Sequence, residues 1–189
     1  MQSSKTSPSK TLMRWTLDDY HQLVKSGILR DRRIELLQGE LIEMAPESPI
    51  HTSKTASGAE YLRQKLSGLA LIREAHPITL ETSEPEPDLA VVKGSSHQDY
   101  ADHHPYPEDI FLLVEIANST LAYDLNEKQQ TYAAANIPEY WVLDTVNKKL
   151  HVFRQPQSKA YKETLALDSG ILTLVAFPAV QISVKAFLG

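Results

Sequence analysis

The sequence contains no cysteine, which excludes disulfide bonds, thiolate metal sites and cysteine nucleophiles together. It also contains no apolar run of about eighteen residues, the length needed to cross a membrane. The opening segment, MQSSKTSPSKTLMRW, lacks the apolar stretch of a secretory signal. We therefore expect a cytoplasmic protein with no membrane partner, in which any metal ion would be held by oxygen ligands and imidazole.

The chain also has no excess of positive charge. The formal net charge of -5 gives no overall attraction for nucleic acid, although the first half of the chain is locally basic. With 189 residues, 42% hydrophobic content and only seven glycines, the chain can bury a substantial core. We expect a disordered tail over residues 1–10 and a single domain over residues 11–189.

Hydrophobic patterns and chain breakers predict the order of the secondary structure. Helices are expected at about 16–27, 50–66 and 124–135. A hairpin is expected about the Gln38–Gly39 turn, followed by strands at about 70–76, 88–92, 110–117 and 139–144, then a meander of shorter strands. This order predicts an α/β (α+β) fold with a mixed sheet flanked by helices.

One strand carries a charge in an unusual place. The run FLLVEIANST, residues 111–120, reads as a central strand covered on both faces, yet Glu115 lies in its middle. Burial of an unpaired carboxylate costs several kcal/mol, about the stability margin of a small domain. Glu115 should therefore be protonated, paired with a cation or bound to a metal ion.

Two further charges suggest which partner Glu115 has. Asp88 opens the strand before it, and two carboxylates on neighbouring strands can share a divalent cation. Lys128 falls on the apolar stripe of the following helix, where a lysine either snorkels or meets the acids. Alone, Asp88 reads as a turn residue and Lys128 as a snorkelling side chain. Together, two acids and a lysine are the parts needed to hydrolyse a phosphodiester.

These motifs resemble a known family. PDL at 87–89, VEIANST at 114–120, DLNEKQQTYAAANIPEYWVLD at 124–144, and the upstream ELLQGELIEM and SPIHTSK are similar to an endonuclease family abundant in cyanobacteria. That family, formerly a domain of unknown function, belongs to the PD-(D/E)xK restriction-endonuclease-like superfamily. The resemblance covers about residues 33–155. It implies an αβββαβ core, Mg²⁺ that Mn²⁺ can replace, and catalytic residues Asp88, Glu115 and Lys128.

The resemblance has two departures and one addition. The superfamily places lysine two positions after the second acid, where this chain has Ala117; the family supplies it from the next helix, at the position of Lys128. Asn136 replaces a glycine after that helix, and asparagine also tolerates a left-handed cap. His51 matches a family histidine and is a candidate metal ligand or phosphate contact, although a histidine at a helix start is often structural.

The pattern around the remaining acids that we considered indicates no catalytic role. Glu35, Glu40 and Glu43 are interpreted as solvent-facing charges on the hairpin, with Glu43 able to approach the site, and Asp144 as a turn residue. The histidine-rich loop at 94–109 is interpreted as a solvated loop.

The sequence thus predicts a metal-dependent endonuclease acting on nucleic acid, with DNA favoured over RNA. By the resemblance we expect a homodimer, because cutting a duplex requires two active sites. Two alternatives stay open: an inactive nuclease-like module that binds or regulates, and a metal-dependent hydrolase of small phosphoesters. No helix-turn-helix, zinc finger or basic arm indicates which target sequence would be read.

Overall fold

The structure, a computed structural model, describes residues 11–189. The helices are α1 (Leu17–Ser26), α2 (Pro49–Lys65), α3 (Leu121–Tyr123), α4 (Gln129–Ala134) and α5 (Val184–Leu188). The strands are β1 (Ile34–Leu37), β2 (Glu40–Glu43), β3 (Leu71–Glu74), β4 (Leu89–Val92), β5 (Ile110–Ala117), β6 (Glu139–Asp144), β7 (Lys149–Gln157), β8 (Ala160–Leu167), β9 (Ile171–Thr173) and β10 (Gln181–Ser183). The tail predicted for residues 1–10 lies outside the described residues. None of the helices in residues 11–189 combines the length and apolar character required to span a bilayer.

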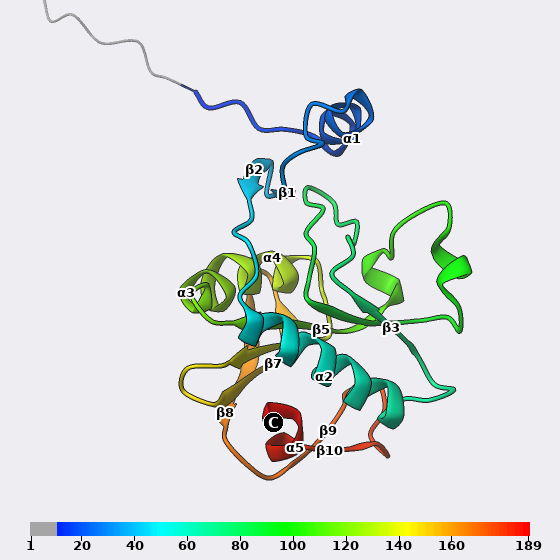
Figure 1. Cartoon of the computed structure of the whole chain (residues 1–189), viewed down its shortest axis with the longest axis vertical. Helices are drawn as coiled ribbons and strands as arrows, with labels where there is room; N and C mark the ends of the chain where they lie inside the picture. The colour runs from blue at the N-terminus through cyan, green and yellow to red at the C-terminus, as the bar shows by residue number, and fades with distance from the viewer. Residues whose placement is uncertain (1–10) are drawn as a thin grey trace, which may run out of the picture.

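A six-stranded mixed sheet forms the centre of the molecule (Figure 1). Its strand order is β3-β4-β5-β6-β7-β8, and only β5 and β6 run parallel. A parallel pair requires a crossover, which the helical segment between β5 and β6 provides. The element order α2-β3-β4-β5-helix-β6 is the predicted αβββαβ core, so the predicted fold class is confirmed.

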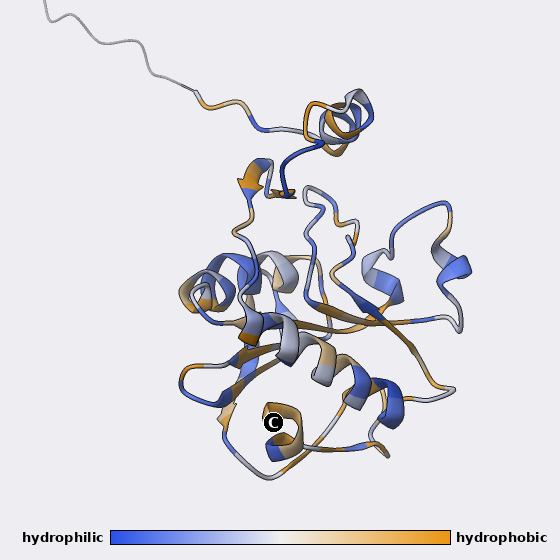
Figure 2. Cartoon of the chain, in the orientation of Figure 1, coloured by the Kyte–Doolittle hydropathy of each residue, from blue (hydrophilic) through white to orange (hydrophobic). Residues whose placement is uncertain are grey.

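Helices cover both faces of this sheet. On one face, α2 and α5 pack through Leu62 and Phe187 against Val114, Ile116 and their neighbours. On the other face, α4 packs through Tyr132 and Ala133 against a second buried cluster. Figure 2 shows the largely apolar sheet strands beside the more polar α2, whereas α5 is itself largely apolar. Because successive residues of a strand face opposite sides, β5 is buried on both, as its continuous apolar run predicted.

The crossover helix is longer than predicted and irregular. It runs from Leu121 to Ala134, and residues Asp124–Lys128 form a π-helical turn between α3 and α4. A π turn widens the helix by one residue and occurs frequently at functional sites. Asp124, where the predicted helix was to begin, lies inside the observed helix, and both it and Lys128 are buried.

The N-terminal hairpin of β1 and β2 lies beyond the edge of the main sheet with α1 (Figure 1). It is anchored to the segment before β4, because Glu84 N–H donates to the Leu36 carbonyl at 2.7 Å and Gly39 N–H donates to the Thr82 carbonyl at 3.1 Å. The meander prediction was wrong at its end. The 171–173 strand leaves β8 and pairs with β10 in a separate two-stranded sheet, since the later strand β10 offers it an antiparallel partner.

Candidate active site

A cavity of about 410 Å³ opens where β1–β2, the start of α2, β5 and the crossover helix meet. Its lining holds many more acids than bases. The acids are Glu35, Glu43, Glu47, Glu86, Asp88, Glu115 and Asp124, and the bases are Arg33, His51 and Lys128. Since like charges within a few ångströms repel, this cavity is suited to a cation and unsuited to a bare phosphate.

Glu115 projects from β5 toward the crossover helix and is 4% exposed. Its Oε1 atom accepts from Lys128 Nζ at 3.0 Å and from the Tyr132 hydroxyl at 2.8 Å. Burial raises the pKa of Glu115 well above its usual value, Lys128 opposes that rise, and the charge of Asp88 adds to it. Of the three states expected for Glu115, which were protonation, pairing with a cation and metal binding, the structure shows pairing with a cation, Lys128.

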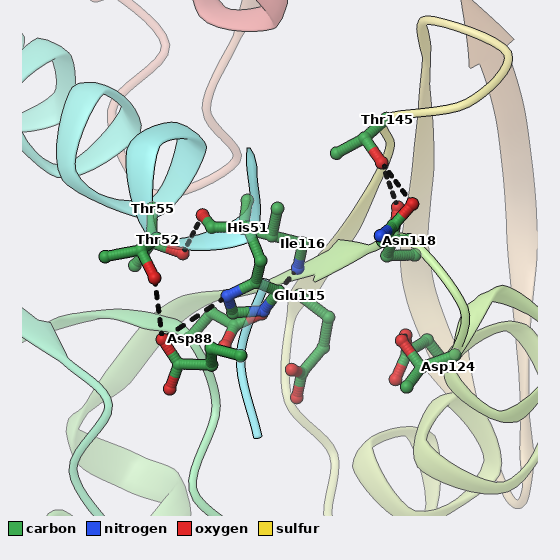
Figure 3. Close-up of polar contacts among 12 residues, drawn as sticks. His51, Thr52, Thr55, Asp88, Glu115, Ile116, Asn118, Asp124 and Thr145 are labelled. Carbon is green, nitrogen blue, oxygen red and sulfur yellow. Dashed lines mark hydrogen bonds and ion pairs between the residues drawn. The ribbon is translucent and has the colours of Figure 1, made fainter. Parts of the chain in front are cut away.

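Asp88 stands immediately before β4, beside the C-terminal part of β5. Its Oδ2 atom accepts from the Ile116 N–H at 2.6 Å, which ties the carboxylate to the Glu115 strand. His51 Nε2 lies 3.0 Å from the same oxygen (Figure 3). The structure thus brings Asp88 and His51 together and sets Glu115 on the strand beside them.

His51 is placed by the first turn of α2. Ser48 caps this helix by accepting from the His51 N–H, so the imidazole points from the helix start toward Asp88. The hydrogen bond to Asp88 raises the pKa of His51, against an opposing effect of burial, and Glu47 at 3.5 Å from Nδ1 adds to the rise. A protonated imidazole has no free lone pair for a metal ion. The assignment of His51 as a metal ligand stays a prediction.

Lys128 is about as buried as Glu115, with 5% exposure. Its ammonium group lies 3.0 Å from Glu115 Oε1 and 3.4 Å from Glu35 Oε2. Burial alone would lower the pKa of Lys128, but Glu115, Glu35 and Asp124 outweigh it and raise that pKa. Lys128 therefore remains an ammonium ion that points into the cavity rather than snorkelling to solvent.

Comparison with known proteins identifies the family of the chain. A family model described as "Uma2: Putative restriction endonuclease" matches residues 17–185. The chain belongs to the Uma2 family. Among solved structures, it is similar to one titled "putative nuclease belonging to DUF820", from Anabaena variabilis, with a TM-score of 0.70 and 15% identity, over 92% of this chain and 97% of that one. At that identity the likeness shows the fold. No curated protein matches the chain.

Within this Uma2 chain, sequence reasoning missed Glu35. It was interpreted as a solvent-facing hairpin charge, and that was wrong, because Glu35 is 1% exposed and contacts Lys128. The hairpin folds onto the segment before β4, which buries the face that a free hairpin would expose. The sequence carries only a weak signal that Glu35 is buried, because an acid between Ile34 and Leu36 fits a half-exposed strand as well as a buried one. Glu40 is exposed, as predicted.

Asp124 and Tyr132 were also absent from the predicted site. Asp124 is 3% exposed and accepts from the Thr120 hydroxyl at 2.6 Å. Burial raises the pKa of Asp124 to about 6, although Lys128 and Thr120 lower it. Asp144, in contrast, accepts from the backbone N–H groups of Val146 and Asn147, which confirms its interpretation as a turn residue.

The chemistry of these donors fits a divalent metal ion. Hard cations prefer carboxylate oxygens, and Asp88 Oδ1 and Glu115 Oε2 accept no hydrogen bond from residues 11–189. No group of three or more His, Asp and Glu side chains in the described part of the chain is already arranged around one point as a metal site. Two carboxylates and water would have to complete the coordination, and Glu115 would share its charge between the metal and Lys128.

Proposed function

We propose that this Uma2 protein is a metal-dependent endonuclease that hydrolyses phosphodiester bonds in DNA. The observation that supports this most is the shared position of Asp88, Glu115 and Lys128 on one acidic cavity. A nucleic-acid phosphate cannot approach seven carboxylates unless a cation neutralises part of their charge. The family description supports a nuclease, and its term "restriction endonuclease" supports DNA as the substrate.

In this proposal Asp88 and Glu115 would hold Mg²⁺, or Mn²⁺ in its place. When bound, the metal ion would polarise the phosphate and make a water molecule easier to deprotonate. Lys128 would orient the attacking water and stabilise the charge that grows on the phosphate oxygens. His51 and the Ile116 N–H hold Asp88 in place, and Tyr132 holds Glu115.

The first test is calorimetric titration of Mn²⁺ into wild type, Asp88→Asn and Glu115→Gln. Glu40→Gln, which removes an exposed acid of the hairpin outside the cavity, is the matched control. We expect binding by wild type and Glu40→Gln and none by the two site variants. Glu115→Gln should remain folded, because it removes repulsion from Asp88 and leaves Lys128 paired with Glu35.

The same four proteins would then be tested on plasmid DNA, single-stranded DNA, RNA and a small phosphodiester. Metal binding and DNA cleavage lost together in both site variants would support the proposal. DNA cleavage should also fall steeply with added salt, as contacts to phosphates are screened, whereas hydrolysis of a small ester should not.

One observation favours a second candidate, an inactive nuclease-like module. Lys128 already satisfies Glu115 without a metal ion, and a buried ion pair of this kind can serve structure alone. If wild type binds no Mn²⁺, then Asp88, Glu115 and Lys128 have a structural role, and the inactive module replaces the endonuclease as the proposed function.

We also propose a homodimer, since cleavage of both strands of a duplex calls for two active sites. Light scattering on the full-length chain, with and without a DNA duplex, would measure the mass. A mass of one chain under both conditions, together with duplex cleavage, would contradict the dimer.

A further inference from the structure

Of the two carboxylates within 4 Å of the Lys128 ammonium group among residues 11–189, the proposed reaction uses Glu115 and not Glu35. Glu35 on β1 is 1% exposed, and its Oε2 atom lies 3.4 Å from Lys128 Nζ. The same oxygen accepts from the Glu86 N–H at 3.2 Å, so its position is fixed by the backbone before β4. Glu35 thus faces the lysine from the hairpin, while Glu115 faces it from the central strand.

The two carboxylates differ in what a metal ion would do to them. A divalent cation that takes Glu115 withdraws electron density from this carboxylate and repels the ammonium group beside it. The shorter contact of Lys128, at 3.0 Å to Glu115 Oε1, would then weaken, because Glu115 would share its charge with the metal ion while Lys128 must face the reacting phosphate. A carboxylate outside the metal's donor set, such as Glu35 at 3.4 Å, would keep its full attraction for the ammonium group in the cavity.

Resting on the nuclease function proposed above, we propose that Glu35 is a positioning residue that retains the Lys128 ammonium group in the active site when a metal ion engages Glu115. The hairpin is therefore part of the active site. Its attachment through Leu36 to Glu84 sets the distance between Glu35 and the lysine.

The first experiment needs no metal ion. In protein labelled with ¹⁵N-lysine, a buried and hydrogen-bonded ammonium group gives its own slowly exchanging NMR signal, and loss of that signal in Lys128→Met assigns it. Glu115→Gln imitates the withdrawal of Glu115, and we expect the Lys128 signal to persist. In the double variant Glu35→Gln/Glu115→Gln we expect the signal to disappear. A signal that survives in the double variant, or that is lost already in Glu115→Gln, would overturn the proposal.

A second experiment separates positioning from metal ligation. Glu35→Gln should bind Mn²⁺ with a dissociation constant within about threefold of wild type, because Glu35 is outside the donor set. Its kcat should fall by about 100-fold with little change in KM, as expected for a misplaced catalytic group. Glu35→Asp should recover part of kcat, and Glu40→Gln on the same hairpin should behave as wild type.

The outcomes are distinguishable. A loss of Mn²⁺ affinity of more than tenfold in Glu35→Gln would make Glu35 a metal ligand and refute positioning. A fall in kcat that only follows a lower unfolding temperature, without rescue by Glu35→Asp, would make its role structural. If wild type binds no Mn²⁺, the proposed function fails, whereas the metal-free NMR comparison still decides whether Glu35 holds Lys128.

Discussion

Replacement of Lys128 by methionine is the sharpest test of the electrostatic cluster. Methionine keeps much of the side chain's volume and removes the charge, so the carboxylates of Glu115 and Glu35 lose the only ammonium group within 4 Å among residues 11–189. At 3.0 Å and 3.4 Å, with an effective dielectric constant of about 20, each attraction is on the order of 5 kcal/mol. Desolvation of the three groups cancels most of this sum.

The expected change in unfolding free energy is set by the charge left unpaired in the variant, and not by the full Coulomb attraction in wild type. Removing one partner of a buried ion pair costs about 3 to 5 kcal/mol, because it leaves an uncompensated charge. One carboxyl group can take up a proton and limit the loss, so we expect Lys128→Met to lower the unfolding free energy by about 3 kcal/mol at pH 8. For a chain of this size that corresponds to a melting temperature about 6 to 12 °C lower.

Urea unfolding from pH 5 to pH 8, in EDTA, measures this difference. Without Lys128 the pKa of Glu115 in the folded state rises further above its unfolded value, so the variant regains stability as pH falls through that folded pKa. The gap to wild type should therefore narrow toward pH 5. Lys162→Met, at an exposed position of β8, should change stability by less than about 0.5 kcal/mol. A Lys128→Met protein as stable as wild type at pH 8 would refute the paired-charge account.

Three further outcomes are expected. The pKa of Asp124 is raised in the folded state to about 6, from 3.8. Its negative charge therefore lowers the unfolding free energy by about 2 to 3 kcal/mol above pH 6, and this cost disappears as pH falls below the unfolded pKa. In metal-free urea titrations, Asp124→Asn should be more stable than wild type at pH 8 and equally stable near pH 4. Tyr132→Phe should cost about 1 to 3 kcal/mol in the same assay, since it removes the hydroxyl that donates to Glu115 at 2.8 Å. Glu139→Gln should cost about 3 kcal/mol and leave Mn²⁺ binding unchanged, because the fully buried Glu139 pairs with Arg154, outside the cavity.

Most of the fold could be predicted from local pattern. The continuous apolar runs at 110–117 and 139–144 became β5 and β6 with the expected bounds, because a strand buried on both faces needs no alternation. The 50–66 helix was right to within one residue, since Ser48 and Pro49 supply a cap and a first turn. The pairing of β9 with β10 was missed, because three-residue strands carry too little periodicity to show their partner.

Part of the candidate site could also be predicted from local pattern. Glu115 and Lys128 stand out in sequence because each interrupts an apolar pattern, and Asp88 because it directly precedes one; a charge in such a place requires a partner. The sequence by itself determined that these three residues had to be compensated and that a crossover helix would return over the β5 strand.

Only the tertiary structure decided which atoms compensate them. Glu35 lies 93 residues before Lys128 in the chain, and its burial depends on the hairpin docking beside β4, an event that no local pattern around Glu35 records. The π turn that directs Asp124 and Lys128 into one cavity depends likewise on packing across the sheet. Local sequence sets the need for charge compensation, but distances between segments far apart in sequence arise only when the sheet, helix and hairpin have packed together.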